Sequence, residues 1–304
     1  MNIITLFDWL PRWARRHMVV KLCIRLFPGL RKQAIEFNEK GKAFVDLADP
    51  NPRNYFLTKS FEPEFFEIAL PFLNGGGTFF DCGANFGLCS FGLAGMVQPP
   101  NVDFHLFEAN PGLVPFLNES RGLHPMCRFT ITHGCLSDRV GTSRLSISEV
   151  SSGQSFATAD EGVNVDNVVL DDYIEHRAIS EVTFMKLDIE GYEPYALRGL
   201  VRSFQKGIVK AIYVEASPET LARAGFAMND LVGLLREGGF AVFLCKPEDI
   251  ARVPTAEWFS CRICDLPLRL APLNVEIDFQ TDFLAIHKTS GFFTMIQPSL
   301  PGQA

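Results

Sequence analysis

The sequence predicts an α/β fold in which helices cover both faces of a seven-stranded, mostly parallel sheet. From Gly77 onward, short apolar runs alternate with segments of helical periodicity, a pattern typical of strands joined by helical crossovers. The 304 residues are 47% hydrophobic and 21% charged, so the chain can bury a full core and does not have the composition of a disordered protein. The predicted strands are 78–82, 102–107, 129–133, 182–187, 209–214, 240–245 and 283–287.

Helices are predicted between these strands, and two stretches interrupt the alternation. Residues 141–170 alternate with period two and predict an inserted antiparallel pair of strands. Residues 246–282 are rich in proline and aromatics, and we expect a loop or lid over one end of the sheet. Gly238 and Gly239 follow the predicted helix over 229–237, where a glycine commonly ends a helix as its C-cap. The predicted helices are 88–96, 112–120, 194–204, 218–224 and 229–237.

The N-terminal segment is basic and amphipathic. Positions 9–33 hold seven Lys and Arg residues and no Asp or Glu. We expect 1–52 to form a helical extension, 53–290 the main domain and 291–304 a C-terminal tail. Packing of the helix on the body or on a second subunit, in a homodimer, is favoured over weak peripheral membrane contact. The apolar side of the helix would consist of Leu6, Leu10, Trp13, Val20, Ile24 and Phe27.

Charge, targeting signals and cysteine usage narrow the function classes. The net charge of −7 excludes a protein whose main task is to grip nucleic-acid phosphates. No apolar run approaches the ~20 residues of a membrane span, and no secretory signal is recognisable, so we expect a cytoplasmic protein without a transmembrane segment. The eight cysteines lie mostly in apolar stretches. Cys261 and Cys264 have CxxC spacing but lack two further metal ligands, so their predicted role is structural.

A ligand-binding turn follows the first strand. Asp81 and Gly83 end that strand, and a helix begins five residues after Gly83. A glycine lets the backbone approach a ligand closely, and a helix start offers free N–H groups to a carboxylate. A dinucleotide fingerprint would require glycine at position 81. An aspartate there better suits the amino group of S-adenosylmethionine.

Two further strand ends complete the predicted cofactor site. Glu108 ends the second strand, where a carboxylate can accept hydrogen bonds from both hydroxyls of a ribose. After the third strand, Ser137 or Asp138 is positioned to contact an adenine amine, with Cys135 and Leu136 beside the ring. An ordinary polar turn explains these last residues equally well.

The fourth and fifth strands carry charges at the same edge. Lys186, Asp188 and Glu190 alternate along one side of the fourth strand, and Glu215 ends the fifth. Buried charges are costly unless they are used or paired. Either a salt-bridged cluster or a catalytic edge accounts for them, and this crevice is where ligands bind in open α/β sheets.

Four motifs in order resemble the FkbM family of S-adenosylmethionine-dependent methyltransferases: FDCGANFG (80–87), FEANP (107–111), LDDYI (170–174) and MKLDIEGYEPYALRGL (185–200). The resemblance covers about residues 53–245. It implies a Rossmann-like class I methyltransferase fold and O-methylation of a small molecule, sugar or secondary metabolite. Leu170, Asp171 and Asp172 are expected to be structural, as a cap on a short helix. The predicted cofactor residues are Asp81, Gly83, Ala84, Asn85, Gly87, Glu108, Ala109, Ser137 and Asp188.

The sequence offers several candidates for the catalytic base and for the wall of an acceptor pocket. Asp188, Glu190, Glu215 and, more weakly, His133 are candidates to remove the acceptor proton. A divalent metal held by Asp188, Glu190 and Glu215 is possible but not favoured. The rival functions are a nicotinamide-dependent oxidoreductase and a non-catalytic binding module on the same fold. Aromatic residues that either wall an acceptor pocket or, by preference, pack in the core are Phe61, Phe65, Phe66, Trp258 and Phe259.

Overall fold

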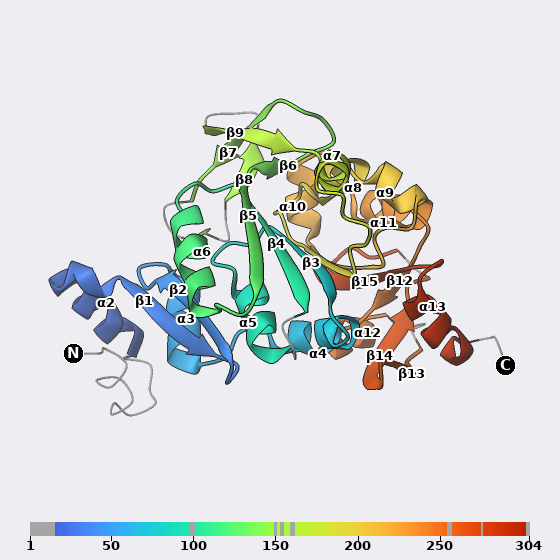
Figure 1. The fold of residues 1–304 in the computed structure, drawn as a ribbon, viewed down its shortest axis with the longest axis horizontal. Helices are drawn as coiled ribbons and strands as arrows, with labels where there is room; N and C mark the ends of the chain where they lie inside the picture. Colours follow the sequence, from blue (N-terminus) through green and yellow to red (C-terminus); the bar gives the residue numbers. More distant parts are fainter. Residues whose placement is uncertain are drawn as a thin grey trace.

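A computed structural model describes residues 16–97, 101–148, 151–152, 155–158, 162–253, 257–274 and 276–301 of the chain. Its centre is a twisted sheet whose strands follow the order β13-β14-β12-β15-β11-β10-β3-β4-β5 (Figure 1). The segment β11-β10-β3-β4-β5 is parallel throughout, and β15 runs antiparallel to its neighbours. The strands are β3 (Gly77–Cys82), β4 (Val102–Glu108), β5 (Arg128–His133), β10 (Phe184–Leu187), β11 (Ala211–Ala216), β12 (Phe240–Leu244), β13 (Phe259–Ile263), β14 (Leu266–Pro272) and β15 (Thr281–His287).

All seven predicted strands are present, and the fold is of the predicted α/β type with a mostly parallel central sheet. The central strands are buried on both faces, which is why they read as continuous apolar runs instead of alternating ones. In β3, for example, Phe79 and Phe80 point to opposite faces and both are inaccessible to solvent. The described sheet has nine strands, two more than predicted.

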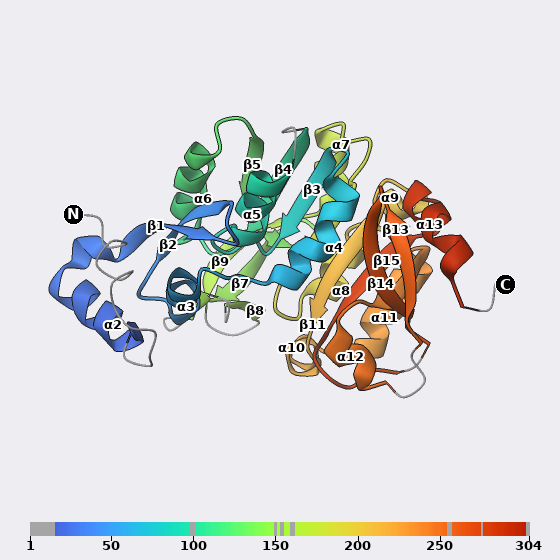
Figure 2. The ribbon, with the colours of Figure 1, turned by 90° about the horizontal axis from the view of Figure 1, so that it is seen from below.

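Two hydrophobic cores lie on the two faces of the sheet, and the helices divide between them (Figure 2). The core that contains Phe79 is covered by α4 (Pro63–Leu73) and α5 (Leu88–Met96), and the core that contains Phe80 by α8 (Glu193–Arg198) and α11 (Met228–Glu237). A predicted helix over 194–204 breaks at Gly199, whose close approach to the Ser137 carbonyl leaves no room for a side chain. The helices on the second face are α7 (Leu170–His176), α8 (Glu193–Arg198), α9 (Val201–Gln205), α10 (Pro218–Arg223), α11 (Met228–Glu237) and α12 (Pro247–Ala251).

The predicted insertion over 141–170 is a small separate sheet at one end of the molecule (Figure 1). Its strands are β6 (Cys135–Leu136), β7 (Thr142–Ser146), β8 (Phe156–Thr158) and β9 (Val163–Val168), in the order β6-β9-β7-β8. β7 and β9 form the predicted antiparallel pair. The LDD segment forms the first turn of α7 and does not cap that helix; Asp171 instead accepts hydrogen bonds from the backbone N–H groups of Arg202 and Ser203 in the first turn of α9.

The expectation of a loop or lid over 246–282 is wrong for the hairpin within it. β13 and β14 pair with each other, and β14 pairs with β12, so the segment lengthens the sheet. The hairpin turns at Cys264 and Asp265, which both have positive φ. Such turns usually have an Asn-Gly sequence, and because this one does not, the sequence gives little sign of the hairpin. All eight cysteines are free, and Cys261 is buried in β13.

The helical extension expected over 1–52 is helical only in part. A hairpin of β1 (Lys32–Phe37) and β2 (Gly41–Asp46) packs on α5 (Leu88–Met96) and α6 (Val114–Ser120). Of the predicted amphipathic helix, α2 (Arg16–Leu26) is observed, whereas Leu6, Leu10 and Trp13 lie outside the described residues. The tail begins with a helix. The remaining elements are η1 (Pro28–Leu30), α3 (Pro50–Thr58), α4 (Pro63–Leu73), η2 (Arg121–Leu123), α13 (Gly291–Ile296) and η4 (Gln297–Ser299).

Within the described residues, no helix has the length and apolar character needed to cross a membrane.

Candidate active site

A cavity of about 320 Å³ lies at the carboxyl ends of β3, β4, β10 and β11. It contacts the turn after β3, the end of β4 and the charged ends of β10 and β11, as predicted for this edge of the sheet. Of the predicted site residues, those that line the cavity are Asp81, Gly83, Ala84, Asn85, Glu108, Ala109, Asp188, Glu190 and Glu215.

The turn after β3 is built around a glycine that no other residue could replace without rearrangement. Gly83 has φ 86°, and a Cβ there would lie 1.9 Å from the carbonyl oxygen of Asp188. Asn85 also has positive φ, which is unusual for a residue with a side chain and marks a conformation held by its surroundings. Gly87 caps α5 and meets the Phe91 ring, so it shapes the turn without lining the cavity.

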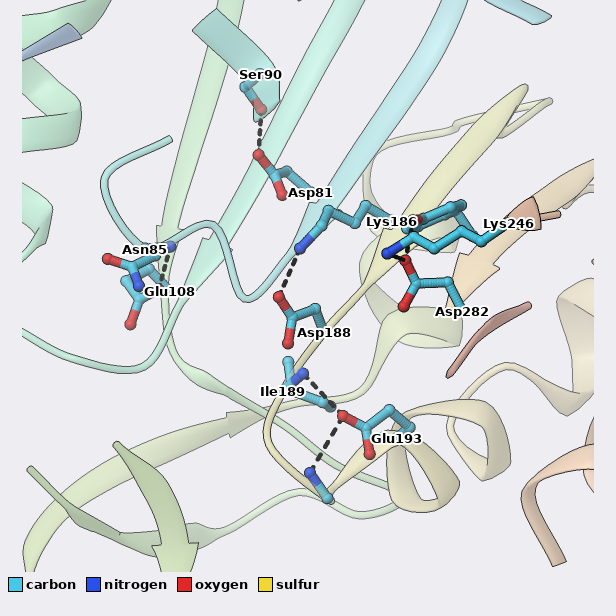
Figure 3. Close-up of polar contacts among 12 residues, drawn as sticks. Asp81, Asn85, Ser90, Glu108, Lys186, Asp188, Ile189, Glu193, Lys246 and Asp282 are labelled. Atoms are coloured by element: carbon cyan, nitrogen blue, oxygen red, sulfur yellow. Dashed lines mark hydrogen bonds and ion pairs between the residues drawn. The ribbon is translucent and has the colours of Figure 1, made fainter. Parts of the chain in front are cut away.

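Glu108 connects the turn after β3 with the loop after β4, and its contact with Asn85 is drawn in Figure 3. One carboxylate oxygen accepts a hydrogen bond from the Asn85 N–H and the other from the Asn110 N–H, each at 2.7 Å. Burial raises the pKa of Glu108 to about 7, against the opposing effect of these backbone donors. A carboxylate offers about four lone-pair sites, so Glu108 can accept a hydrogen bond from a further donor.

The segment that follows β5 contributes apolar surface to the cavity, without the predicted polar groups. Cys135 and Leu136 line the cavity, whereas Ser137 and Asp138 are not among the described residues that do so. Ser137 is buried beside Val168, whose carbonyl accepts from its N–H. His133 is exposed, and its Nε2 contacts the Ala109 carbonyl at 3.1 Å, outside the cavity lining.

A buried lysine lies at the centre of the charged edge (Figure 3). The Nζ of Lys186 donates to Asp188 at 2.5 Å, and its side chain is almost fully buried. Burial alone would lower the pKa of Lys186, but the surrounding carboxylates, Asp188 first, raise it on balance. Asp81, which is fully buried, accepts a hydrogen bond from Ser90 at 2.6 Å on the other side of this lysine.

Three further carboxyl groups face the cavity around this pair. Repulsion from Asp188, followed by burial, raises the pKa of Glu215 to about 8. Burial raises the pKa of Glu190 to about 7, and burial also raises that of Glu62. Glu190 has an Arg223 guanidinium 3.9 Å away.

The backbone of the turn after β10 is held by a second buried acid. Glu193 accepts from the N–H groups of Ile189 and Gly191, at 2.9 and 3.2 Å, while its other oxygen is buried without a hydrogen-bond partner (Figure 3). Burial raises the pKa of Glu193 to about 7. Glu190 between these residues has φ 56°. A bulky residue persists in that conformation only where the surrounding structure imposes it.

Several lining residues could not be found from sequence motifs. Tyr55 from α3, Glu62 before α4, and Phe156 from β8 reach the cavity from distant parts of the chain. No local pattern marks them, since only the packing of α3 and the inserted sheet brings them there. Of the aromatic residues considered for an acceptor wall, Phe61 lines the cavity, whereas Phe65, Phe66 and Phe259 belong to the core.

A second ion pair, whose carboxylate is buried, lies beside Lys186 (Figure 3). Asp282 on β15 accepts hydrogen bonds from the Tyr213 hydroxyl and pairs with Lys246. Among the residues that the structure describes, no three His, Cys, Asp or Glu side chains are placed to share a metal ion, and this includes Asp188, Glu190 and Glu215.

Comparison with protein families decides the identity of this fold. The model of the methyltransferase FkbM domain matches residues 81–242, just over half of the chain. The chain belongs to the FkbM methyltransferase family. The match runs from Asp81 at the cavity to β12, and so contains the Gly83 turn, Glu108 and the edge from Lys186 to Glu215.

Solved structures with detectable similarity are distant. The FkbM methyltransferase from Methylobacillus flagellatus KT is 16% identical with a TM-score of 0.40, over 69% of this chain and 43% of that one. The precorrin-6y C5,15-methyltransferase of Geobacter metallireducens GS-15 is 14% identical with a TM-score of 0.39, over 74% and 88% of the two chains. An O-methyltransferase from Bacillus cereus in complex with SAH is 11% identical with a TM-score of 0.36, over 93% and 96%. No curated protein matches the sequence.

Proposed function

We propose that this FkbM-family methyltransferase binds S-adenosylmethionine in the cavity and methylates a hydroxyl group of a small molecule, sugar or secondary metabolite. The observation that carries the proposal is Glu108, a buried carboxylate in the cavity lining that holds the turn after β3 through the Asn85 N–H and can accept a further hydrogen bond. An acid in this position suits a ribose diol, and the turn beside it suits an amino-acid tail.

The lining residues fit this cofactor in shape and chemistry. Gly83, Ala84 and Asn85 line the cavity, and a side chain at position 83 would collide with the Asp188 carbonyl and displace the turn. Asp81 and Asp188 offer negative charge to an ammonium group. Cys135 and Leu136 provide apolar contacts for a purine ring. A volume of about 320 Å³ is within the range of cofactor pockets.

When bound, S-adenosylmethionine supplies an electrophilic methyl group on a sulfonium. We assign the removal of the acceptor proton to Glu190. Its pKa of about 7 lies near neutral pH, where a general base is most effective. Its backbone is held in place by the turn that Glu193 stabilises. Among the other candidates, Asp188 is engaged by Lys186, and His133 lies outside the cavity lining.

Lys186 has a positioning role in this proposal. Its ammonium group fixes Asp188 and offsets the mutual repulsion of Asp188, Glu62 and Glu215. Without that cation, these three carboxyl groups and that of Glu190 would crowd one edge of the cavity, so the geometry of the methyl acceptor site depends on Lys186.

The direct test combines calorimetric titration with S-adenosylhomocysteine and mass analysis of acceptor pools incubated with S-adenosylmethionine. The proposal requires binding to the homocysteine product and methylation on oxygen of a hydroxylated acceptor. Binding without consumption of the methyl donor by any pool would instead support a non-catalytic module. Titration with NAD tests the oxidoreductase alternative, and turnover after prolonged chelation tests the proposed metal independence.

A further inference from the structure

Exposed apolar side chains gather on α2. The described residues contain ten exposed large hydrophobic side chains, and four of them lie within positions 18–27. The exposed fractions are 70% for Met18, 56% for Leu22, 62% for Leu26 and 61% for Phe27. Single exposed apolar residues are ordinary, but a contiguous group indicates an interaction surface.

The helical geometry separates α2 into two faces. Val20 is fully buried, and Val19, Cys23 and Ile24 pack on the same core. Residues four apart share a face. Met18, Leu22 and Leu26 therefore form one exposed stripe, with the exposed cations Lys21 and Arg25 in a second stripe beside it.

We propose that the α2 surface, formed by Met18, Lys21, Leu22, Arg25, Leu26 and Phe27, docks on an anionic phospholipid membrane. The apolar stripe would enter the boundary between headgroups and acyl chains, and the neighbouring cations would contact the phosphates. Lys and Arg suit that depth because their long stems keep the charge in water. Positions 9–33 carry seven cations and no acid, so the surface is complementary to negative lipid.

A second copy of the chain is a poorer partner for this surface. α2 contains no acidic residue, so pairing two copies of the helix would bring like charges together. A stable protein interface also buries about 800 Å² on each partner, some 20–30 residues a side. The α2 surface is a set of six residues, whereas a bilayer needs no matched pocket.

The location of α2 connects this surface to the cavity. α2 lies at one end of the molecule in both views (Figures 1 and 2) and packs on α3. α3 in turn supplies Asn51, Pro52 and Tyr55 to the cavity wall. Docking through α2 would therefore place one wall of the cavity close to the membrane.

The test is co-sedimentation of the full chain with vesicles of phosphatidylcholine alone or mixed with phosphatidylglycerol. We expect binding to the mixed vesicles only, weakened by high salt. Lys21→Gln with Arg25→Gln should lower the partition coefficient roughly thirtyfold. Leu22→Ser with Leu26→Ser should lower it roughly tenfold or more.

Matched controls use residues of the same type elsewhere on the surface. Arg121→Gln with Lys206→Gln, and Met126→Ser with Val201→Ser, should leave vesicle binding unchanged. The proposal is overturned if the wild type does not bind mixed vesicles, or if the α2 variants bind as well as their controls. Sedimentation velocity gives a third outcome, since a dimer that dissociates in the Leu22→Ser with Leu26→Ser variant would identify a self-association surface instead.

Discussion

Replacement of Glu108 by glutamine should weaken binding of the methyl donor while leaving the chain folded. Both carboxylate oxygens accept backbone hydrogen bonds at 2.7 Å, from Asn85 and from Asn110. Glutamine has one oxygen, so its amide group would face one of these N–H donors, and a ribose hydroxyl would lose a charged acceptor. A hydrogen bond to a charged group contributes about 1.5–3 kcal/mol. The affinity for S-adenosylhomocysteine should therefore fall roughly 10- to 150-fold.

Calorimetric titration over a range of pH measures this effect and its origin. Because burial raises the pKa of Glu108 to about 7, protonation below that pH removes an acceptor, and wild-type affinity should decline as the pH falls through about 7. The glutamine variant has no such group to titrate and should show a flatter profile. Glu237→Gln, an exposed control, should behave as the wild type does. Unchanged affinity in the Glu108→Gln variant would refute the assignment of this carboxylate to the cofactor.

Three further predictions concern the turn, the base and a buried acid. Gly83→Ala should abolish cofactor binding, since its Cβ would lie 1.9 Å from the Asp188 carbonyl, whereas Gly122→Ala, which meets no atom, should bind normally in the same titration. Glu190→Gln should retain S-adenosylhomocysteine binding but lower kcat by about 10²- to 10⁴-fold. In the wild type, kcat/KM should rise as the pH rises through about 7, and this rise should be absent in the variant. A loss of binding as large as the loss of kcat would contradict a role as base. Glu193 has a folded pKa of about 7, above its unfolded value, so its protonated form stabilises the fold below the unfolded pKa and that stability is lost as the pH rises through about 7. The free energy of unfolding of the wild type should therefore fall between pH 5 and 8, and Glu193→Gln should make that fall smaller by at most about 3 kcal/mol, as measured by urea titration. An unaltered pH dependence in the variant would show that the pKa of Glu193 does not change on folding.

The sequence alone determined the sheet and the turn at its edge. The seven central strands are recognisable because strands covered on both faces must be continuously apolar, a local property of each segment. Gly83 is recognisable because a tight turn between a buried strand and a helix favours a residue without a side chain. Glu108 is recognisable because it ends the next parallel strand, at the same edge of the sheet. Those features follow from residues adjacent in the chain.

Only the tertiary structure decided which side chains share the cavity. His133 ends the predicted strand and Ser137 lies shortly after it, but neither lines the cavity: β6 pairs with β9, and the His133 ring contacts the Ala109 carbonyl. Tyr55 and Glu62 enter it from a segment with no motif. The β1–β2 and β13–β14 hairpins turn at Asn38–Glu39 and Cys264–Asp265, which have positive φ without a glycine and so lack the usual sequence signal of a tight hairpin. Local chemistry specifies where a strand ends, whereas contacts between distant segments specify where its last side chains point.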